Sequence, residues 1–338
     1  MKTSLYQVVL SVALTSVIVL GGGDVLGLTD EQTVLAHQGN ALQNTIQSVQ
    51  AKVKEAEVGQ NEKPSAQGEG QESGLMSDGA AEWIAQHPFT YDDSKTVDEN
   101  IADAEKLTKE FLDKFGETDQ INTPERQRLR KNIADELYGE GAKTKNREVF
   151  LIVGQPASGK STFADSLIAE QGALLVDSDE AKKRLPEFSN GLLSIAVHSE
   201  SSNIADNVLA RAIENGDNIV MPIVGKTYDN LKERVDKFKE AGYTVKLIYI
   251  DLPLPKAIER VKKRFKETGR LIHPAYLQSV GLKPKQNYDK LKKTKGVDSY
   301  EAWSNDVPRG NRPLLIESSS QQQEQQASTR MGGRGLDS

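Results

Sequence analysis

Short apolar runs alternate with helical stretches over the second half of the chain. Each run is four to six residues long, which suits a buried strand. Strands that alternate with helices predict an α/β fold, in which helices cover both faces of a parallel sheet and ligands bind at the carboxyl ends of the strands. The expected strands are residues 149–153, 173–176, 219–223, 245–250 and 313–316, and the expected helices lie near residues 201–215, 228–241 and 255–266.

A second pattern, with helical spacing alone, precedes this region. Thr123 and Pro124 form an N-cap and first-turn pair between its two halves. We therefore expect a helical N-terminal extension over residues 79–145, packed against a nucleotide-binding domain over residues 146–317. The apolar faces of its helices would be Ile101, Ala104, Leu107, Phe111, Leu112 and Phe115, followed by Leu129, Ile133 and Leu137.

The two ends of the chain differ from the middle. Residues 1–24 place Lys2 before an apolar run that closes on three glycines, which fits an export signal or weak anchor and also a plain apolar helix. Residues 25–78 are polar and low in complexity and predict a flexible tether, and residues 318–338 predict a disordered tail. The location follows from the first segment: cytoplasmic if it is no signal, exported or membrane-tethered otherwise.

Residues 154–161, GQPASGKS, match the phosphate-binding pattern G-x-x-x-x-G-K-[ST] between the first expected strand and a helical face. The glycines let consecutive backbone N–H groups point at phosphate oxygens, and the following helix directs its positive end the same way. Lys160 is expected to neutralise phosphate charge and Ser161 to bind Mg²⁺. A P-loop NTPase type of fold that binds a nucleoside triphosphate follows, with predicted binding residues Gly154, Gln155, Pro156, Ala157, Ser158, Gly159, Lys160, Ser161 and Thr162.

Composition narrows the possible chemistry. A net charge of −6 gives no electrostatic case for nucleic acid as the main partner. The chain has no cysteine, which excludes disulfides, thiolate zinc sites and cysteine nucleophiles. Its four histidines show no recognised metal-binding spacing.

Two carboxylates directly follow the strand expected at residues 173–176. Asp177 and Asp179 should therefore lie at the same rim of the sheet as the P-loop. In phosphoryl transfer an aspartate accepts the proton of the acceptor hydroxyl, and we take Asp179 as the base, with Asp177 second. Either residue could instead cap the helix that begins near Glu180, and Asp177 is favoured as a cap or metal-shell residue.

The segment 256–270 is strongly basic and carries an apolar stripe. Arginine binds phosphate through its planar fork, so this segment is a candidate lid that closes over the nucleotide. The alternative is an ordinary solvated face.

Four motifs occur along the chain in the order found in the zeta-toxin family of kinases, and the chain resembles that family over roughly residues 148–291. They are the P-loop, the turn 177–180 with residues 182–186, the turn 222–226, and Arg264 with Thr268-Gly269-Arg270. The resemblance implies an ATP-dependent, Mg²⁺-assisted kinase that phosphorylates a hydroxyl of a nucleotide sugar, typically UDP-N-acetylglucosamine. It also implies a separate antitoxin protein as a possible partner.

The resemblance assigns roles on the donor side first. Lys160 and Ser161 match the phosphate and magnesium groups, and Asp179 matches the catalytic base. Arg264 and Arg270 match arginines that hold the γ-phosphate, which favours the lid interpretation.

On the acceptor side, Asp206 matches an acidic residue that contacts the amino sugar, and Lys226 lies near a basic residue of the same pocket. Asp177 is counted with these substrate-binding residues. Pro222 stands where better-known toxins have a glutamate, which leaves the acceptor open. His198 precedes the helix of Asp206 and is either a pocket residue or a structural histidine.

Two other functions fit the same residues. One is a general metabolite kinase, similar to gluconate or shikimate kinases, which also place an aspartate after the second strand of a P-loop sheet. The other is a regulatory ATP-binding module that hydrolyses slowly or not at all. The kinases are distinguished from the regulatory module by whether ATP is consumed only when an acceptor molecule is present.

Overall fold

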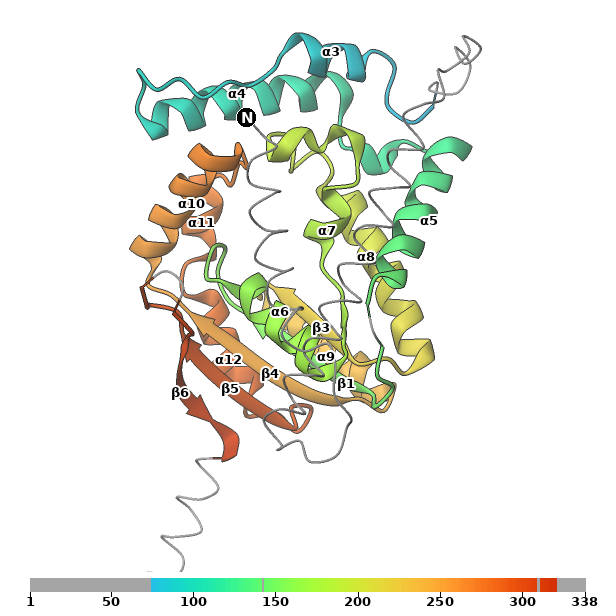
Figure 1. Cartoon of the computed structure of the whole chain (residues 1–338), viewed down its shortest axis with the longest axis vertical. Helices are drawn as coiled ribbons and strands as arrows, with labels where there is room; N and C mark the ends of the chain where they lie inside the picture. Colours follow the sequence, from blue (N-terminus) through green and yellow to red (C-terminus); the bar gives the residue numbers. More distant parts are fainter. Residues whose placement is uncertain (1–73, 142, 309–310, 321–338) are drawn as a thin grey trace, which may run out of the picture. The chain divides into compact units, whose positions relative to one another are not determined.

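The computed structural model describes residues 74–141, 143–308 and 311–320 (Figure 1). The apolar segment 1–24, most of the predicted tether and the tail from residue 321 lie outside the described residues. None of the helices in the described part of the chain is long and apolar enough to cross a membrane. The helical elements are α3 (Ala80–Gln86), α4 (Val97–Phe115), η1 (Thr118–Gln120), α5 (Pro124–Gly139), α6 (Lys160–Gln171), α7 (Ser178–Lys182), η2 (Pro186–Gly191), α8 (His198–Asn215), α9 (Tyr228–Glu240), α10 (Leu254–Thr268), α11 (Pro274–Val280) and α12 (Lys283–Leu291).

The strands form a single mixed sheet in the order β2-β3-β1-β4-β5-β6. Their bounds are β1 (Glu148–Val153), β2 (Leu174–Leu175), β3 (Ile219–Ile223), β4 (Thr244–Asp251), β5 (Ser299–Ser304) and β6 (Leu314–Ser318). Val149 at the start of β1 lies between Ile219 of β3 and Val245 of β4, in parallel register with both. The carboxyl ends of β1, β2, β3 and β4 therefore meet at one rim, where the P-loop begins.

The predicted parallel sheet is confirmed for β1 to β4, and the unpredicted strand β5 extends it in parallel beside β4. The last strand differs. β6 pairs antiparallel with β5, because the connection between them is too short for a helical crossover. The apolar pattern did not predict β5, since its sequence SYEAWS mixes polar and apolar residues and only Ala302 is fully buried.

Helices cover both faces of the sheet, as the alternating pattern predicts (Figure 1). Along β1, Phe150 and Ile152 face α6, where they pack with Ala164. Val149 and Leu151 face the opposite side, together with residues of α5, α8, α9 and α12. This alternation follows from the two-residue period of a strand, and burial on both faces explains the unbroken apolar run of β1.

The N-terminal extension contributes its own helices and joins the core. Thr123 accepts a hydrogen bond from the backbone of Arg126, which confirms the predicted cap of α5. Trp83 of α3 and Phe111 of α4 pack in one apolar cluster with Leu193 and with Phe265 of α10. The extension therefore contacts both the segment before α8 and the basic helix α10.

Candidate active site

The P-loop folds tightly because two of its glycines leave no room for a side chain. A Cβ on Gly154 would come within 2.8 Å of the carbonyl oxygen of Ile250. Gly159 has a φ of +95°, and a Cβ there would clash with the side chain of Asn305. Asn305, which follows β5, donates from Nδ2 to the carbonyl oxygen of Ser158 at 2.6 Å. The loop is thus held by a residue that follows β5, as well as by its own glycines.

Lys160 begins α6 and folds back over the loop. Its Nζ donates to the carbonyl oxygens of Gly154 at 2.8 Å and Gln155 at 2.9 Å. Burial lowers the pKa of Lys160 to about 8, although the charges of Asp177 and Asp179 act in the opposite direction. A partly buried cation beside two carboxylates and a curled backbone suits an anionic ligand such as a phosphate chain.

The two aspartates at the start of α7 differ in their surroundings. Asp177 caps the helix, since its Oδ1 accepts the backbone N–H of Asp179 at 2.9 Å. Burial and the neighbouring carboxylate raise the pKa of Asp177 to about 6. Burial also raises the pKa of Asp179, but the charges of Arg270 and Lys182 outweigh it and bring that pKa to about 2. The capping alternative therefore describes Asp177, whereas Asp179 presents an ionised carboxylate to the cavity.

Both oxygens of Asp179 have a cationic partner. Oδ2 accepts from Nη2 of Arg270, and Oδ1 lies 3.2 Å from Nζ of Lys182. The guanidinium of Arg264, near the end of α10, makes no hydrogen bond or ion pair with any described residue. Burial and the nearby charge of Arg270 lower the pKa of Arg264, yet an arginine remains charged at neutral pH. The site thus holds one unpaired guanidinium and one that is occupied by the aspartate.

These groups line a cavity of about 1040 Å³ at the carboxyl rim of the sheet. Its wall combines the P-loop, the start of α7, the end of β3, the start of α8 and the segment from α10 to α11. The cavity brings together most of the predicted site residues, namely Pro156, Ala157, Gly159, Lys160, Ser161, Thr162, Asp177, Asp179, His198, Pro222, Lys226, Arg264 and Arg270.

Asp206 is the predicted substrate residue that the structure leaves outside this lining. Its carboxylate lies on α8, is more than half exposed, and faces Arg234 of α9 at 3.5 Å. Arg234 does line the cavity, so Asp206 reaches the site only through that partner. Lys226 lines the cavity at its mouth, where it donates to the hydroxyl of Ser279 at 2.9 Å and lies over the ring of Tyr276.

Sequence reasoning missed several residues of this site. Lys182 was treated only as part of a motif, although its ammonium is buried against Asp179. Arg260 was one cation among many in the basic segment, and Asn305 follows a strand that the pattern did not predict. Arg260 and Arg264 lie one helical turn apart, so both face the cavity side of α10. This spacing is the feature of the sequence from which Arg260 could have been predicted.

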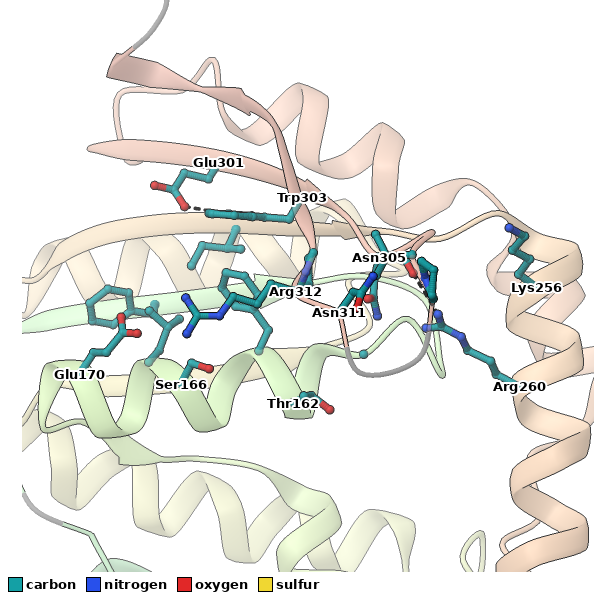
Figure 2. A pocket seen from close by; sticks show the side chains of 18 of the residues that line it. Thr162, Ser166, Glu170, Lys256, Arg260, Glu301, Trp303, Asn305, Asn311 and Arg312 are labelled. Carbon is teal, nitrogen blue, oxygen red and sulfur yellow. Dashed lines mark hydrogen bonds between the residues drawn. The ribbon is translucent and has the colours of Figure 1, made fainter.

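A second hollow of about 1050 Å³ adjoins the P-loop on the α6 side (Figure 2). Thr162, Ser166 and Glu170 follow one side of α6 into it, and Trp303 and Arg312 lie opposite. It shares a wall with the first cavity, formed by Gly159, Thr162, Arg260 and Arg264. Arg260 donates to the carbonyl oxygen of Asn305 at 2.9 Å within that wall.

Comparison with solved structures gave matches of low sequence identity. The crystal structure of AvrRxo1-ORF1:AvrRxo1-ORF2 with ATP is 19% identical with a TM-score of 0.49, over 62% of this chain and 70% of that chain. The PezAT toxin-antitoxin system of Streptococcus pneumoniae is 16% identical with a TM-score of 0.45, over 59% of this chain and 82% of that one. Deoxyadenosine kinase from M. mycoides with bound dATP is 15% identical with a TM-score of 0.27, over 54% and 99%. No curated protein matches the chain.

In the comparison with protein families, the zeta toxin profile matches residues 135–306, which is just over half of the 338 residues. That range begins near the end of α5 and includes the P-loop, the two aspartates of α7 and the arginines of α10. The chain therefore belongs to the zeta toxin family and is an ATP-dependent kinase.

Proposed function

We propose that this kinase transfers the γ-phosphate of ATP to a hydroxyl group of a nucleotide sugar such as UDP-N-acetylglucosamine. The observation that carries the proposal is the position of Asp179, an ionised carboxylate in the same cavity as Lys160 and Arg264. Lys226 and Arg234 add positive charge to the lining of the cavity, which suits an acceptor that itself carries phosphate.

The transfer assigns a separate task to each group. The acceptor oxygen attacks the γ-phosphorus, the bond to the oxygen that bridges to ADP breaks, and Asp179 accepts the hydroxyl proton. Lys160 and Arg264 stabilise the charge on the phosphate chain. In this structure Arg270 pairs with Asp179, and a γ-phosphate would compete for the same guanidinium. Once Arg270 turns to the phosphate, Asp179 keeps only Lys182 as a cationic partner and becomes a stronger base.

Mg²⁺ belongs to this proposal, and when bound it would neutralise negative charge on the phosphates. Ser161 would hold the ion, and the donor set fits, because its hydroxyl lines the same cavity as the carboxylate of Asp177. No group of three potential metal-binding side chains occurs among the described residues. A kinase magnesium ion takes only one or two protein oxygens besides phosphates and waters, so a hydroxyl and a neighbouring carboxylate are sufficient.

A separate antitoxin protein is the partner we propose on the basis of family membership. The cavity mouth, with exposed Ile195 and Tyr276, is where such a partner would block access to the acceptor side. Co-expression with the product of a neighbouring gene, followed by co-purification and relief of growth arrest, tests this part.

The test of the function is a product assay with the full chain, Mg-ATP and a panel of nucleotide sugars, dinucleotides and simple sugar acids. We expect a phosphate-sized mass gain on UDP-N-acetylglucosamine, which is absent for Lys160→Ala. Asp179→Asn should retain ATP binding while turnover falls by about a hundredfold or more. A gain on a different compound replaces the acceptor and keeps the kinase mechanism, whereas full turnover in Asp179→Asn would remove the base assignment.

A further inference from the structure

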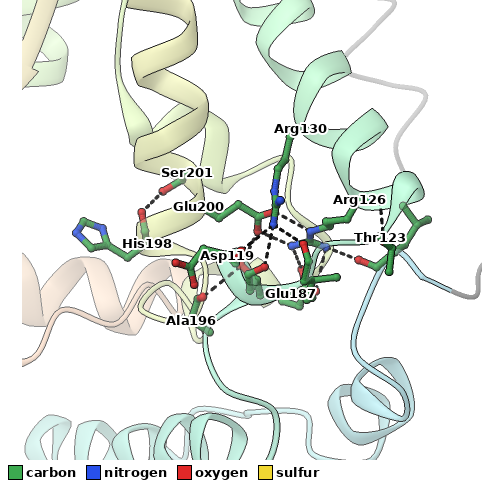
Figure 3. Close-up of polar contacts among 12 residues, drawn as sticks. Asp119, Thr123, Arg126, Arg130, Glu187, Ala196, His198, Glu200 and Ser201 are labelled. Carbon is green, nitrogen blue, oxygen red and sulfur yellow. Dashed lines mark hydrogen bonds and ion pairs between the residues drawn. The ribbon is translucent and has the colours of Figure 1, made fainter.

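Arg126 is a fully buried arginine on α5, N-terminal to the region that matches the family profile. Its Nε and Nη2 donate to Glu200 at 2.8 and 2.6 Å, and its Nη1 and Nη2 donate to Glu187 at 3.0 and 2.9 Å (Figure 3). Nη1 also donates to the carbonyl oxygen of Leu75 at 2.6 Å. Arg130 donates to Glu200 from its Nε at 2.6 Å. All five N–H groups of Arg126 thus have acceptors, and two arginines balance two glutamates.

The two glutamates mark the ends of one segment, which we call the acceptor wall (residues 187–200). Glu187 lies in η2, and Glu200 lies in the first turn of α8. Arg126 therefore joins the beginning and the end of the wall through a single guanidinium. Between these ends the wall turns into the cavity and contributes Ser194, Ile195 and His198 to its lining.

The extension also holds the middle of the acceptor wall. The hydroxyl of Thr108 on α4 donates to the carbonyl oxygen of Leu192 at 3.1 Å. The backbone N–H of Thr118 in η1 donates to the carbonyl oxygen of Ala196 at 2.9 Å. Ser199 of the wall also donates from its hydroxyl to Glu117 at 2.7 Å. With the two glutamates, the extension contacts the wall at five residues along its length.

The acceptor wall in turn lies against the backbone of Arg270. Leu271 donates its N–H to the carbonyl oxygen of Gly191 at 3.3 Å. A Cβ on Gly191 would come within 2.8 Å of the Cα of Arg270, so the two backbones are in direct contact. A shift of the wall would therefore move both the acceptor lining and the arginine that pairs with Asp179.

Stability alone is a poor explanation for this cluster. Arg126, Glu187 and Glu200 are buried, and Arg130 is partly exposed. Burying three charges costs solvation free energy, and apolar side chains of similar size often stabilise a protein as well or better. What the ion cluster adds is directional geometry, because a guanidinium fork fixes the two carboxylates relative to each other. We propose that Arg126 is a positioning residue through which the helical extension sets the acceptor wall and Arg270 for phosphoryl transfer; this proposal rests on the kinase function proposed above.

The experiment compares two substitutions with a matched control in the full chain. Arg126→Lys keeps the charge and removes the fork, and Glu187→Gln keeps the size and removes the charge, which serves if the first variant does not fold. Arg128→Lys is the control, since Arg128 lies on the same helix with its side chain 67% exposed. Acceptor KM, kcat and ATP Kd are measured at a temperature where circular dichroism shows all variants folded, together with hydrogen exchange of the wall.

We expect kcat/KM for the acceptor to fall about tenfold or more in both test variants, with ATP Kd within about twofold of the wild type. Amide exchange should accelerate in residues 187–200 and stay unchanged in the P-loop. Wild-type kinetics and exchange in a folded variant, or an equal loss in Arg128→Lys, would overturn the proposal. If the wild type phosphorylates no acceptor, the proposed function fails, and exchange in the wall still decides the positioning role.

Discussion

Gly191 offers a direct test of how closely the acceptor wall is fitted to the arginine beside it. Its φ is +104°, in the left-handed region that side chains disfavour, and a Cβ would lie 2.8 to 3.0 Å from three carbon atoms of Arg270. Gly79 has a similar φ of +77° but nothing within 4 Å of a Cβ. Alanine at either position therefore has a similar backbone cost, and only alanine at position 191 adds a steric conflict.

The expected loss of unfolding free energy follows from the backbone cost and the steric conflict. The left-handed backbone conformation destabilises each alanine variant by about 1–2 kcal/mol. Overpacking against a neighbouring backbone adds about 1–3 kcal/mol, so Gly191→Ala should lose about 2–5 kcal/mol of unfolding free energy and Gly79→Ala about 1–2 kcal/mol. A displacement of Arg270 by about 1 Å is enough to lower kcat on the order of a hundredfold.

The unfolding free energy is measured by urea unfolding monitored by tryptophan fluorescence. The turnover rate is measured separately at low denaturant. Turnover is measured with saturating ATP and whichever acceptor the product assay identifies. Equal losses of stability and equal turnover in the two alanine variants would mean that a Cβ at position 191 meets no steric conflict with Arg270. A larger loss of stability in Gly191→Ala with full turnover would mean that the position of Arg270 does not depend on this contact.

Two further predictions use other contacts of the site. Burial and the charge of Lys182 lower the pKa of His198, although the charges of Asp179 and Glu117 act in the opposite direction. The neutral histidine therefore contributes stability to the fold above pH about 6.5. This contribution is lost as the pH falls through that value toward the lowered pKa, because the unfolded chain binds the proton first. An NMR titration should place the His198 midpoint below the ordinary value, and Lys182→Met should raise it; an unchanged midpoint would contradict the assignment. Asn305→Ala removes a hydrogen bond to the P-loop and should weaken ATP binding about fivefold by calorimetry, and an unaltered Kd would mean that the loop holds its shape alone.

The fold was predictable from sequence because its signals are local. A strand of five or six apolar residues, a glycine-rich turn and a helix give the P-loop and its neighbours without knowledge of any distant contact. The N-cap of α5 at Thr123 was also predictable, because its signal lies in adjacent residues of the sequence. Where the local signal was weak, as in the mixed strand β5, the prediction failed, and with it the role of Asn305 at the P-loop.

The site was predictable only in part, because some of its residues act through partners far away in the chain. Asp179 and Arg270 are 91 residues apart, and Arg126 lies 61 residues before Glu187. Motif order identified the first two, since both belong to the kinase pattern itself. Nothing in the sequence around Arg126 distinguishes it from the exposed Arg128 two positions later, and only tertiary packing buries one and leaves the other in solvent.

The pairing of Asp179 with Arg270 suggests why these distant segments need to be fitted together. An aspartate with a pKa of about 2 is a weak base, so the arrangement seen here is unsuited to proton transfer. A bound γ-phosphate that attracts Arg270 would strengthen the base once the donor is in place. That exchange requires Arg270 to move its side chain while its backbone stays fixed. The contact with Gly191 restrains that backbone, and the extension restrains the acceptor wall through Arg126, so a part of the chain outside the family profile supports the step on which the chemistry depends.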